Sequence, residues 1–139
     1  MPARSTLAST TRPVDEKITI NIGCVDLGQI DLLVQEGFYA NRTDLIRTAI
    51  RNQLTTHGDA VREVVSRKTL VLGIQHYTAA DLQAVKAAGE MLQIRVLGLA
   101  SIADDVTPKL ALATIESLTV LGALRASPAV KAALSERIA

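Results

Sequence analysis

The amino-acid sequence predicts an α/β chain of 139 residues in two parts. In the first part, one short alternating strand precedes two amphipathic helices, and no hairpin partner for the strand follows nearby. In the second part, three strand-like runs each precede a helix-start signal, which favours a small βαβαβα module with a parallel sheet. A lone strand leaves its backbone groups unpaired, so we expect a second copy of the chain to supply the partner strand.

Composition is that of a folded protein, with 48% apolar and 21% charged residues. This length suits one ordinary domain or two small ones. Aromatic residues are limited to Phe38, Tyr39 and Tyr77, which argues against RNA or single-stranded DNA bound by base stacking. A formal net charge of +1 neither indicates nor excludes a protein that reads duplex DNA with a few well-placed basic groups.

The sequence predicts a cytoplasmic protein. Its one cysteine, Cys24, permits no internal disulfide, suits a reducing compartment, and is expected to act as a small buried residue after the strand. Residues 1–11 are polar and lack the apolar core of a secretory signal. The longest apolar stretches fall short of the ~20 residues that cross a bilayer, so no membrane partner is expected.

Residues 1–16 are rich in Ser, Thr, Arg and Pro, and they are predicted to form a disordered arm. Arg4 and Arg12 could touch a phosphate or a minor groove, although a solvated tail is the favoured interpretation.

The strand predicted over residues 17–22 has one apolar and one polar face, because side chains on a strand alternate with period two. The apolar face consists of three isoleucines, Ile18, Ile20 and Ile22. The polar face consists of Lys17, Thr19 and Asn21.

Two helices follow the strand. The first is expected to begin with Asp26 as its N-cap and Gln29 completing a capping box, and to end at Gly37 as the C′ residue. The second is expected to begin with Asn41 as its N-cap and Asp44 at position N3. Its apolar residues recur at helical spacing and are expected to face inward: Leu45, Ile46, Ala49, Ile50 and Leu54.

The strand KITINI, the turn EGFYA and the second-helix opening NRTDLIRTAIR resemble, in order and spacing, the ribbon-helix-helix family of the MetJ/Arc/CopG type. The resemblance covers residues 17–54. It implies an obligate dimer in which two strands form a swapped antiparallel ribbon that enters the major groove of operator DNA. It also implies that the second helix presents its first backbone amides to a DNA phosphate, a role that helix physics supports.

Matched residue by residue, the resemblance implies two sets of DNA contacts. The base-contacting positions are Lys17, Thr19 and Asn21. The phosphate-contacting positions are Asn41, Arg42 and Thr43. Gly28 departs from the pattern, since glycine is a poor helix former within the first turn of the first helix.

A Gly-containing break after Leu54 marks the end of the ribbon-helix-helix part at residue 57, and residues 58–68 are predicted to be a linker or a short helix. From residue 69 to 139 the chain shows a weak repeat. The tripeptide Val-Leu-Gly begins at residues 71, 96 and 120, and it is expected to close each strand-like run. A period near 25 is also typical of leucine-rich stacks, though no consensus beyond the tripeptide supports that comparison.

Helices are predicted over residues 79–91, 108–115 and 128–138, the first opened by Thr78 with Asp81 and the others by Thr-Pro and Ser-Pro. The three strands are apolar on both faces, so a sheet built from them needs cover on both sides. Three short helices cover one side only. We therefore expect the other face to meet another subunit or the N-terminal part, and residues 69–139 to form an oligomerisation or effector domain.

The sequence carries none of the common catalytic or metal-binding signatures. The sequence has no phosphate-binding GxxxxGK[ST], no GxSxG and no paired cysteines. His57 and His76 stand nineteen residues apart, which does not favour a nickel-type sensor. Asp104 and Asp105 are interpreted as solvated residues ahead of a helix. We expect no enzyme, no cofactor and no bound metal.

The leading hypothesis is a dimeric or tetrameric transcriptional regulator, acting as a repressor on operator DNA. The alternative is an interaction protein, either an antitoxin or a scaffold, whose C-terminal half binds another protein. The long, apolar C-terminal half is patterned for a core of its own, which favours a built-in oligomerisation or effector module over an antitoxin tail.

Overall fold

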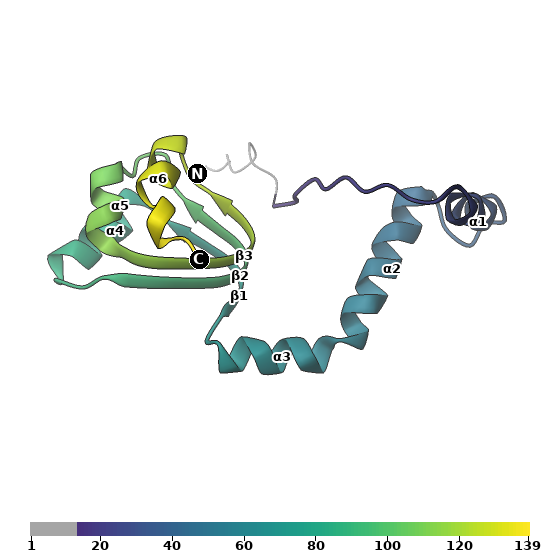
Figure 1. The fold of residues 1–139 in the computed structure, drawn as a ribbon, viewed down its shortest axis with the longest axis horizontal. Coiled ribbons are helices and arrows are strands. Elements are labelled where there is room, and N and C mark those ends of the chain that lie inside the picture. Colours follow the sequence, from purple (N-terminus) through teal and green to yellow (C-terminus); the bar gives the residue numbers. More distant parts are fainter. Residues whose placement is uncertain (1–13) are drawn as a thin grey trace, which may run out of the picture. The chain divides into compact units, whose positions relative to one another are not determined.

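A computed structural model describes residues 14–139 of the protein (Figure 1). These residues form six α-helices and one three-stranded parallel sheet, in two compact units that cover residues 15–64 and 65–139. The α/β class predicted from the sequence is confirmed. The interpretation of Arg4 and Arg12 lies outside the described residues. None of the described helices is both long enough and apolar enough to cross a membrane.

The first helix, α1 (Cys24–Gln35), begins three residues before the predicted start, with Gly23 rather than Asp26 as its N-cap. Gly23 is the N-cap residue with extended backbone (φ −64°, ψ 148°), its carbonyl accepts the N–H of Leu27 at 2.9 Å, and no side chain caps the helix. The predicted capping box of Asp26 and Gln29 is therefore wrong. Asp26 lies inside the first turn instead, where its charge favours the exposed amides of the helix terminus.

Cys24 is exposed, contrary to the expectation of a buried thiol. It occupies the first helical position of α1.

The end of α1 is the one predicted. Gly37 has φ +86°, its N–H donates to the carbonyl of Val34 at 3.1 Å, and the N–H of Phe38 donates to the carbonyl of Leu33 at 3.0 Å. These two bonds form a Schellman motif, which needs a left-handed residue at Gly37.

The second helix, α2 (Arg42–Thr56), begins as predicted. The side-chain oxygen of Asn41 accepts the N–H of Asp44 at 2.8 Å, and the Asp44 carboxylate accepts the N–H of Ala40 at 2.9 Å. The chain then continues through His57 into α3 (Gly58–Arg67), which confirms a short helix at this position. The division between the two units falls inside α3, between Val64 and Val65.

The segment predicted as a strand, residues 17–22, pairs with no strand among residues 14–139. All six of its residues are exposed. A strand is recognised by its ladder of hydrogen bonds to a neighbour, so the ribbon remains a prediction about two chains rather than one.

In the C-terminal unit, β1 (Val71–Tyr77), β2 (Leu92–Ile102) and β3 (Ile115–Arg125) lie in the order β1–β2–β3, all parallel. The parallel sheet predicted from the βαβαβα pattern is confirmed. The Val-Leu-Gly repeat is also the register of the sheet, because Val71, Val96 and Val120 are direct partners. The strands do not end at the tripeptide, as had been expected, but continue beyond its glycine.

The glycines explain why the repeat coincides with the register. Gly73, Gly98 and Gly122 are aligned across the sheet, and each has a positive φ between +120° and +139°. A Cβ atom on Gly98 would lie 2.2 Å from the carbonyl oxygen of Gly73, and one on Gly122 would lie 2.1 Å from that of Gly98. Only a residue without a side chain allows the neighbouring backbone this close.

Three helices follow the strands: α4 (Ala79–Ala87), α5 (Pro108–Thr114) and α6 (Pro128–Ala133), the last continued by a 3₁₀ turn over Ser135–Arg137. The predicted caps are all present, including the full capping box of Thr78 and Asp81. The predicted end of α4 at residue 91 is wrong, because Gly89 with φ +71° closes a second Schellman motif. The predicted continuous helix to residue 138 is also wrong in its last turn, which is 3₁₀.

The core of this unit lies between one face of the sheet and the three helices, which lie next to one another (Figure 1). Leu82 of α4, Ala111 of α5 and Val130 of α6 are fully buried there. The sheet contributes side chains of alternate residues: Ile94, Val96, Ala100, Ile102 and Leu118. The C-terminal unit therefore buries one face of its sheet by itself.

We expect Gly98→Ala to destabilise the protein more than Gly73→Ala. Both substitutions place a side chain at a left-handed position, which costs about 1–3 kcal/mol. Gly73 has open space at its Cβ position, whereas Gly98 would also press on a backbone carbonyl, so its total loss should be on the order of 3–5 kcal/mol. Urea unfolding followed by circular dichroism measures both losses. Equal losses would contradict the close approach of β1 and β2.

Candidate nucleic-acid interface

The N-terminal unit has an apolar surface but no interior. Every residue from 15 to 64 is exposed or half-buried, and neither α1 nor α2 contains a buried residue. Ile18 and Ile20 are 76% and 72% exposed. Several large apolar side chains from the two helices are exposed with them: Val25, Leu32, Leu33, Ile46, Ile50 and Leu54. A surface of this kind is characteristic of a subunit interface.

The polar face of the same segment carries the residues predicted to contact bases. Lys17, Thr19 and Asn21 are all exposed, and they alternate with the isoleucines. If the isoleucines turn toward a second subunit, strand geometry turns these three side chains the opposite way.

The N-terminus of α2 holds the residues predicted to contact phosphate. Asn41 uses its side-chain oxygen to cap Asp44, which leaves its NH₂ group as a donor at the helix end. The amides of Arg42 and Thr43 are the first two of the helix, where N–H groups have no partner within the helix. The helix end therefore offers backbone donors, a side-chain amide and the positive end of the helix dipole to an anion.

Arg42 was predicted to contact phosphate, but in this chain its guanidinium is paired with a carboxylate. Its Nε and Nη2 atoms donate to the two carboxylate oxygens of Asp31 in α1, at 2.7 and 2.9 Å. This bidentate pair connects α1 to the first turn of α2. The hydrogen bond from Arg42 lowers the pKa of Asp31 below its ordinary value of 3.8, and the same bond raises the pKa of Arg42.

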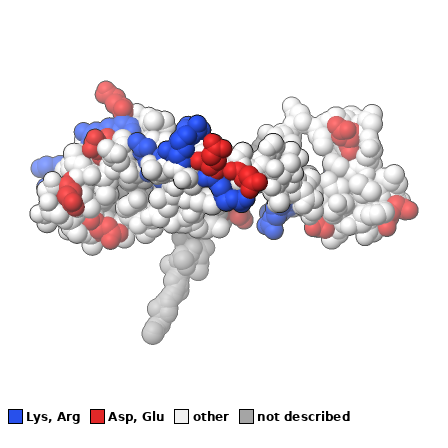
Figure 2. Space-filling view, turned by 90° about the horizontal axis from the view of Figure 1, so that it is seen from below, with Lys and Arg blue, Asp and Glu red and all other residues white. Residues whose placement is uncertain are grey.

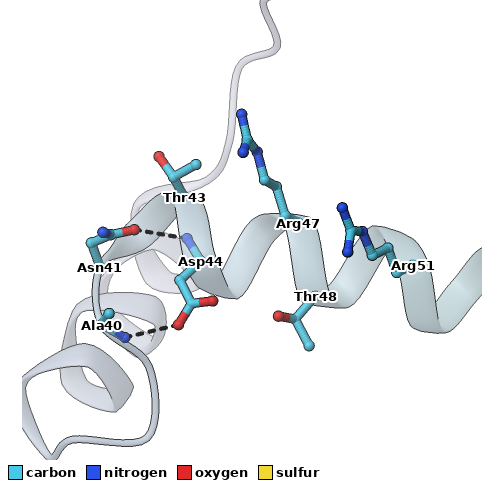
Figure 3. Close-up of a pocket in the computed structure, with 7 residues that line it drawn as sticks. All are labelled: Ala40, Asn41, Thr43, Asp44, Arg47, Thr48 and Arg51. Atoms are coloured by element: carbon cyan, nitrogen blue, oxygen red, sulfur yellow. Dashed lines mark hydrogen bonds between the residues drawn. The ribbon is translucent and has the colours of Figure 1, made fainter. Parts of the chain in front are cut away.

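A basic stripe runs along α2 beside its N-terminus (Figure 3). Thr43, Arg47 and Arg51 stand four residues apart, which places them on one face of the helix. They border a shallow hollow lined by Ala40, Asn41, Thr43, Asp44, Arg47, Thr48 and Arg51. Arg47 and Arg51 also line a second hollow with Asp15 and Glu16, so the stripe adjoins the start of the exposed segment.

Charge outside this stripe is mixed. Figure 2 shows both basic (blue) and acidic (red) side chains on the visible face, and much of that face is white, which marks residues without charge. The face drawn in Figure 2 shows no large basic patch over the described residues.

Among residues 14–139, no three His, Cys, Asp or Glu side chains gather in a way that could hold a metal ion. His57 lies 3.2 Å from the side-chain amide of Gln53, and His76 is exposed on β1.

Comparison with protein families gives one match, to the model of the Ribbon-Helix-Helix transcriptional regulator family, over residues 13–131. The chain belongs to this family, and the resemblance stated from the sequence is confirmed. Family membership indicates a DNA-binding transcriptional regulator, and members of the family are typically not enzymes. Because the match runs to residue 131, the α/β unit is part of what the family model describes. Searches of curated proteins and of solved structures return no match.

Sequence reasoning missed the partner of Arg42 and did not assign a role to Arg47 and Arg51. The spacing of Thr43, Arg47 and Arg51 was a readable signal for one helix face. Asp31 gave no such signal, because eleven residues and a turn separate it from Arg42 and only the crossing of two helices brings them together.

We expect the Asp31 carboxyl to titrate below 3.8 in the folded protein and to return toward 3.8 in Arg42→Met. A lowered folded-state pKa means that this pair stabilises the fold at neutral pH. Its contribution disappears as the pH falls through the lowered value. Carboxyl ¹³C chemical shifts report the midpoint. Arg47→Met is the matched control and should leave the midpoint unchanged, while an unchanged midpoint in Arg42→Met would exclude the ion pair in solution.

Proposed function

We propose that the protein is a homodimeric, sequence-specific repressor whose two segments of residues 17–22 pair as an antiparallel ribbon in the major groove of operator DNA. The second helix then binds a phosphate with its N-terminus. Family membership supports DNA binding and dimerisation, and the exposed residues of the N-terminal unit support this particular arrangement.

The observation that carries the proposal is the absence of any buried residue between residues 15 and 64. Folding fixes backbone and side chains at a cost of roughly 1–2 kcal/mol per residue for the backbone alone, and apolar burial must offset it. In a single chain, the two helices and the exposed segment bury too little apolar surface to offset that entropy cost. A second copy offers the same isoleucines and helix faces, so that association supplies the missing interior.

The two faces of the segment then have separate roles. The isoleucines face the helices of both subunits, and Lys17, Thr19 and Asn21 face outward from the ribbon. Lysine and asparagine match acceptor and mixed donor–acceptor patterns on guanine and adenine, and a threonine hydroxyl serves either base. Short polar side chains on a flat ribbon suit the major groove, which admits a two-stranded β-ribbon.

The phosphate contact is proposed for Asn41 and Thr43, through the side-chain NH₂, the hydroxyl and the first amides of α2. Arg42 contributes in a different way while it is paired with Asp31. The pair sets the angle at which α2 leaves α1, and the guanidinium keeps its remaining donors for a phosphate. Arg47 adds a positive charge on the same helix face as Thr43.

Repression is the regulatory outcome proposed, because a ribbon that fills the major groove and two helices clamped on phosphates exclude other proteins from the same site. The alternative from another class is an interaction protein, antitoxin or scaffold, that binds a protein through its C-terminal unit. The apolar sheet face left open in that unit is the observation that favours it.

We expect Ile20→Lys to convert the dimer to monomers, because a charge would then lie in the shared core. Thr19→Lys is the matched control. It places the same side chain one residue away on the polar face, and it should leave the dimer intact. Sedimentation velocity of the full chain distinguishes the two species. A dimer that survives Ile20→Lys would contradict the ribbon.

We expect the double variant Thr19→Ala, Asn21→Ala to lose operator specificity while it keeps its fold and dimeric state. Each lost base contact should cost about 1–3 kcal/mol of discrimination, which is roughly 5- to 150-fold. Operator sites found by sequencing of bound genomic fragments provide the DNA for fluorescence anisotropy. Affinity for unrelated duplex should change little, because phosphate contacts remain. A double variant as selective as the wild type would refute base readout by this face.

A further inference from the structure

The sheet of the C-terminal unit has one face that its helices leave open. Side chains alternate along each strand, so the neighbours of the core residues Val96 and Ala100 project to the opposite side. The register aligns these neighbours in two rows across the three strands. The first row is Leu72, Leu97 and Leu121, and the second is Ile74, Leu99 and Ala123. We call these six residues the open sheet face.

The open sheet face is apolar, and its outer strands are accessible, whereas Leu99 on the middle strand is 8% exposed. Leu72, Ile74 and Leu121 are 67%, 58% and 52% exposed, and Leu97 on the middle strand is half-buried. Polar rows border it on both sides: Arg95 with Thr119 toward the strand starts, and Ser101 with Arg125 toward the strand ends. An apolar patch with polar borders has the pattern of a protein–protein contact, and this one is small enough for the unit to remain soluble without a partner.

We propose that the open sheet face packs against the same face of the second subunit in the ribbon dimer. The inference rests on the proposed function, since the ribbon is what brings the second subunit. Two copies of a flat apolar face meet as one isologous interface, with the two sheets about 10 Å apart. No charged residue lies within the six, so a second copy meets no unpaired charge in the contact.

The size of the face determines which copy it binds. Three strands about 4.8 Å apart and two rows of side chains cover roughly 200–300 Å². A stable interface between free partners needs about 800 Å² on each side. The open sheet face is therefore too small to hold free molecules together, but it suffices for a contact between units already linked. Linkage raises the effective concentration to the millimolar range, and this favours the partner within the same dimer over another dimer.

Cross-linking of the full chain tests the proposal in a Cys24→Ser background. Leu97 lies at the centre of the patch and should approach its own symmetry mate. A short bismaleimide should therefore join Leu97→Cys chains at least tenfold faster than Leu112→Cys chains. Leu112 is the matched control, an exposed leucine on α5, which packs on the covered side of the sheet. Adding Leu121→Asp to Leu97→Cys should slow cross-linking about tenfold with an unchanged circular dichroism spectrum.

Sedimentation of the same samples distinguishes the possible failures. A chain that sediments as a monomer without any variant refutes the proposed ribbon dimer itself. A dimer in which Leu97→Cys and Leu112→Cys cross-link at equal rates refutes only the sheet contact, and it leaves the face open to another protein. Cross-linked species that sediment as tetramers would overturn the assignment to one dimer. Val96→Asp should unfold the C-terminal unit, since Val96 is 1% exposed in the core, whereas Leu97→Asp should not.

Discussion

Burial of apolar side chains is incomplete in both units when each is taken as a single chain, and this constraint determines most of what the protein can do. The N-terminal unit leaves its isoleucines and the inner residues of two helices in solvent. The C-terminal unit covers one face of its sheet with three helices and leaves the other open. Stability of only about 5–15 kcal/mol is the norm for folded domains, so burial of either surface on association would be a large addition. Burying either surface in an association would release free energy that the single chain does not gain.

The two units differ in how much their stability depends on burial by a second molecule. The C-terminal unit has a closed cluster that includes Leu82, Val96 and Leu118, together with caps at all three helix starts. The N-terminal unit has well-defined local structure, with a Schellman motif at Gly37 and a cap at Asn41, but no interior. Local hydrogen bonds set the ends of its helices, and the bidentate pair of Asp31 and Arg42 joins them. In the proposed dimer, the second subunit supplies the packing.

The sequence predicted best those features that follow from local chemistry. Caps at Asn41, Thr78 and Ser127 and the turn at Gly37 were readable because each depends on residues within four positions. The parallel sheet was predicted from the alternation of strand-like runs and helix-start signals. The structure shows why the Val-Leu-Gly repeat recurs, because its glycines lie where aligned strands approach too closely for a Cβ atom. The start of α1 was mispredicted because aspartate is favourable both as an N-cap residue and inside the first turn of a helix. The end of α4 was mispredicted although Gly89 was a visible stop signal.

The candidate site was only partly accessible from sequence, for a related reason. Alternation places Lys17, Thr19 and Asn21 together on any extended segment, whereas the partner of Arg42 depends on how two helices cross. An arginine at a helix start is predicted to bind phosphate, and the sequence gives no sign that a carboxylate from another helix pairs with it. The pairing also changes the role that Arg42 can have in the proposed complex. The carboxylate of Asp31 weakens the attraction of Arg42 to a phosphate by neutralising part of its charge. The same pairing already restricts the guanidinium, so that less side-chain entropy is lost on binding, and this offsets part of the weakened attraction.

A regulator with a net charge of +1 gains little from long-range attraction to DNA. In the proposed dimer, affinity comes from short-range contacts made by two subunits together, so that binding is coupled to dimer stability by mass action. In that setting, the proposed sheet contact has a consequence far from the sheet itself. Any free energy it adds to the dimer lowers the protein concentration at which two ribbons are paired, and DNA occupancy rises with the paired fraction. The α/β unit would then influence the operator without touching it, through the same apolar burial that completes the fold.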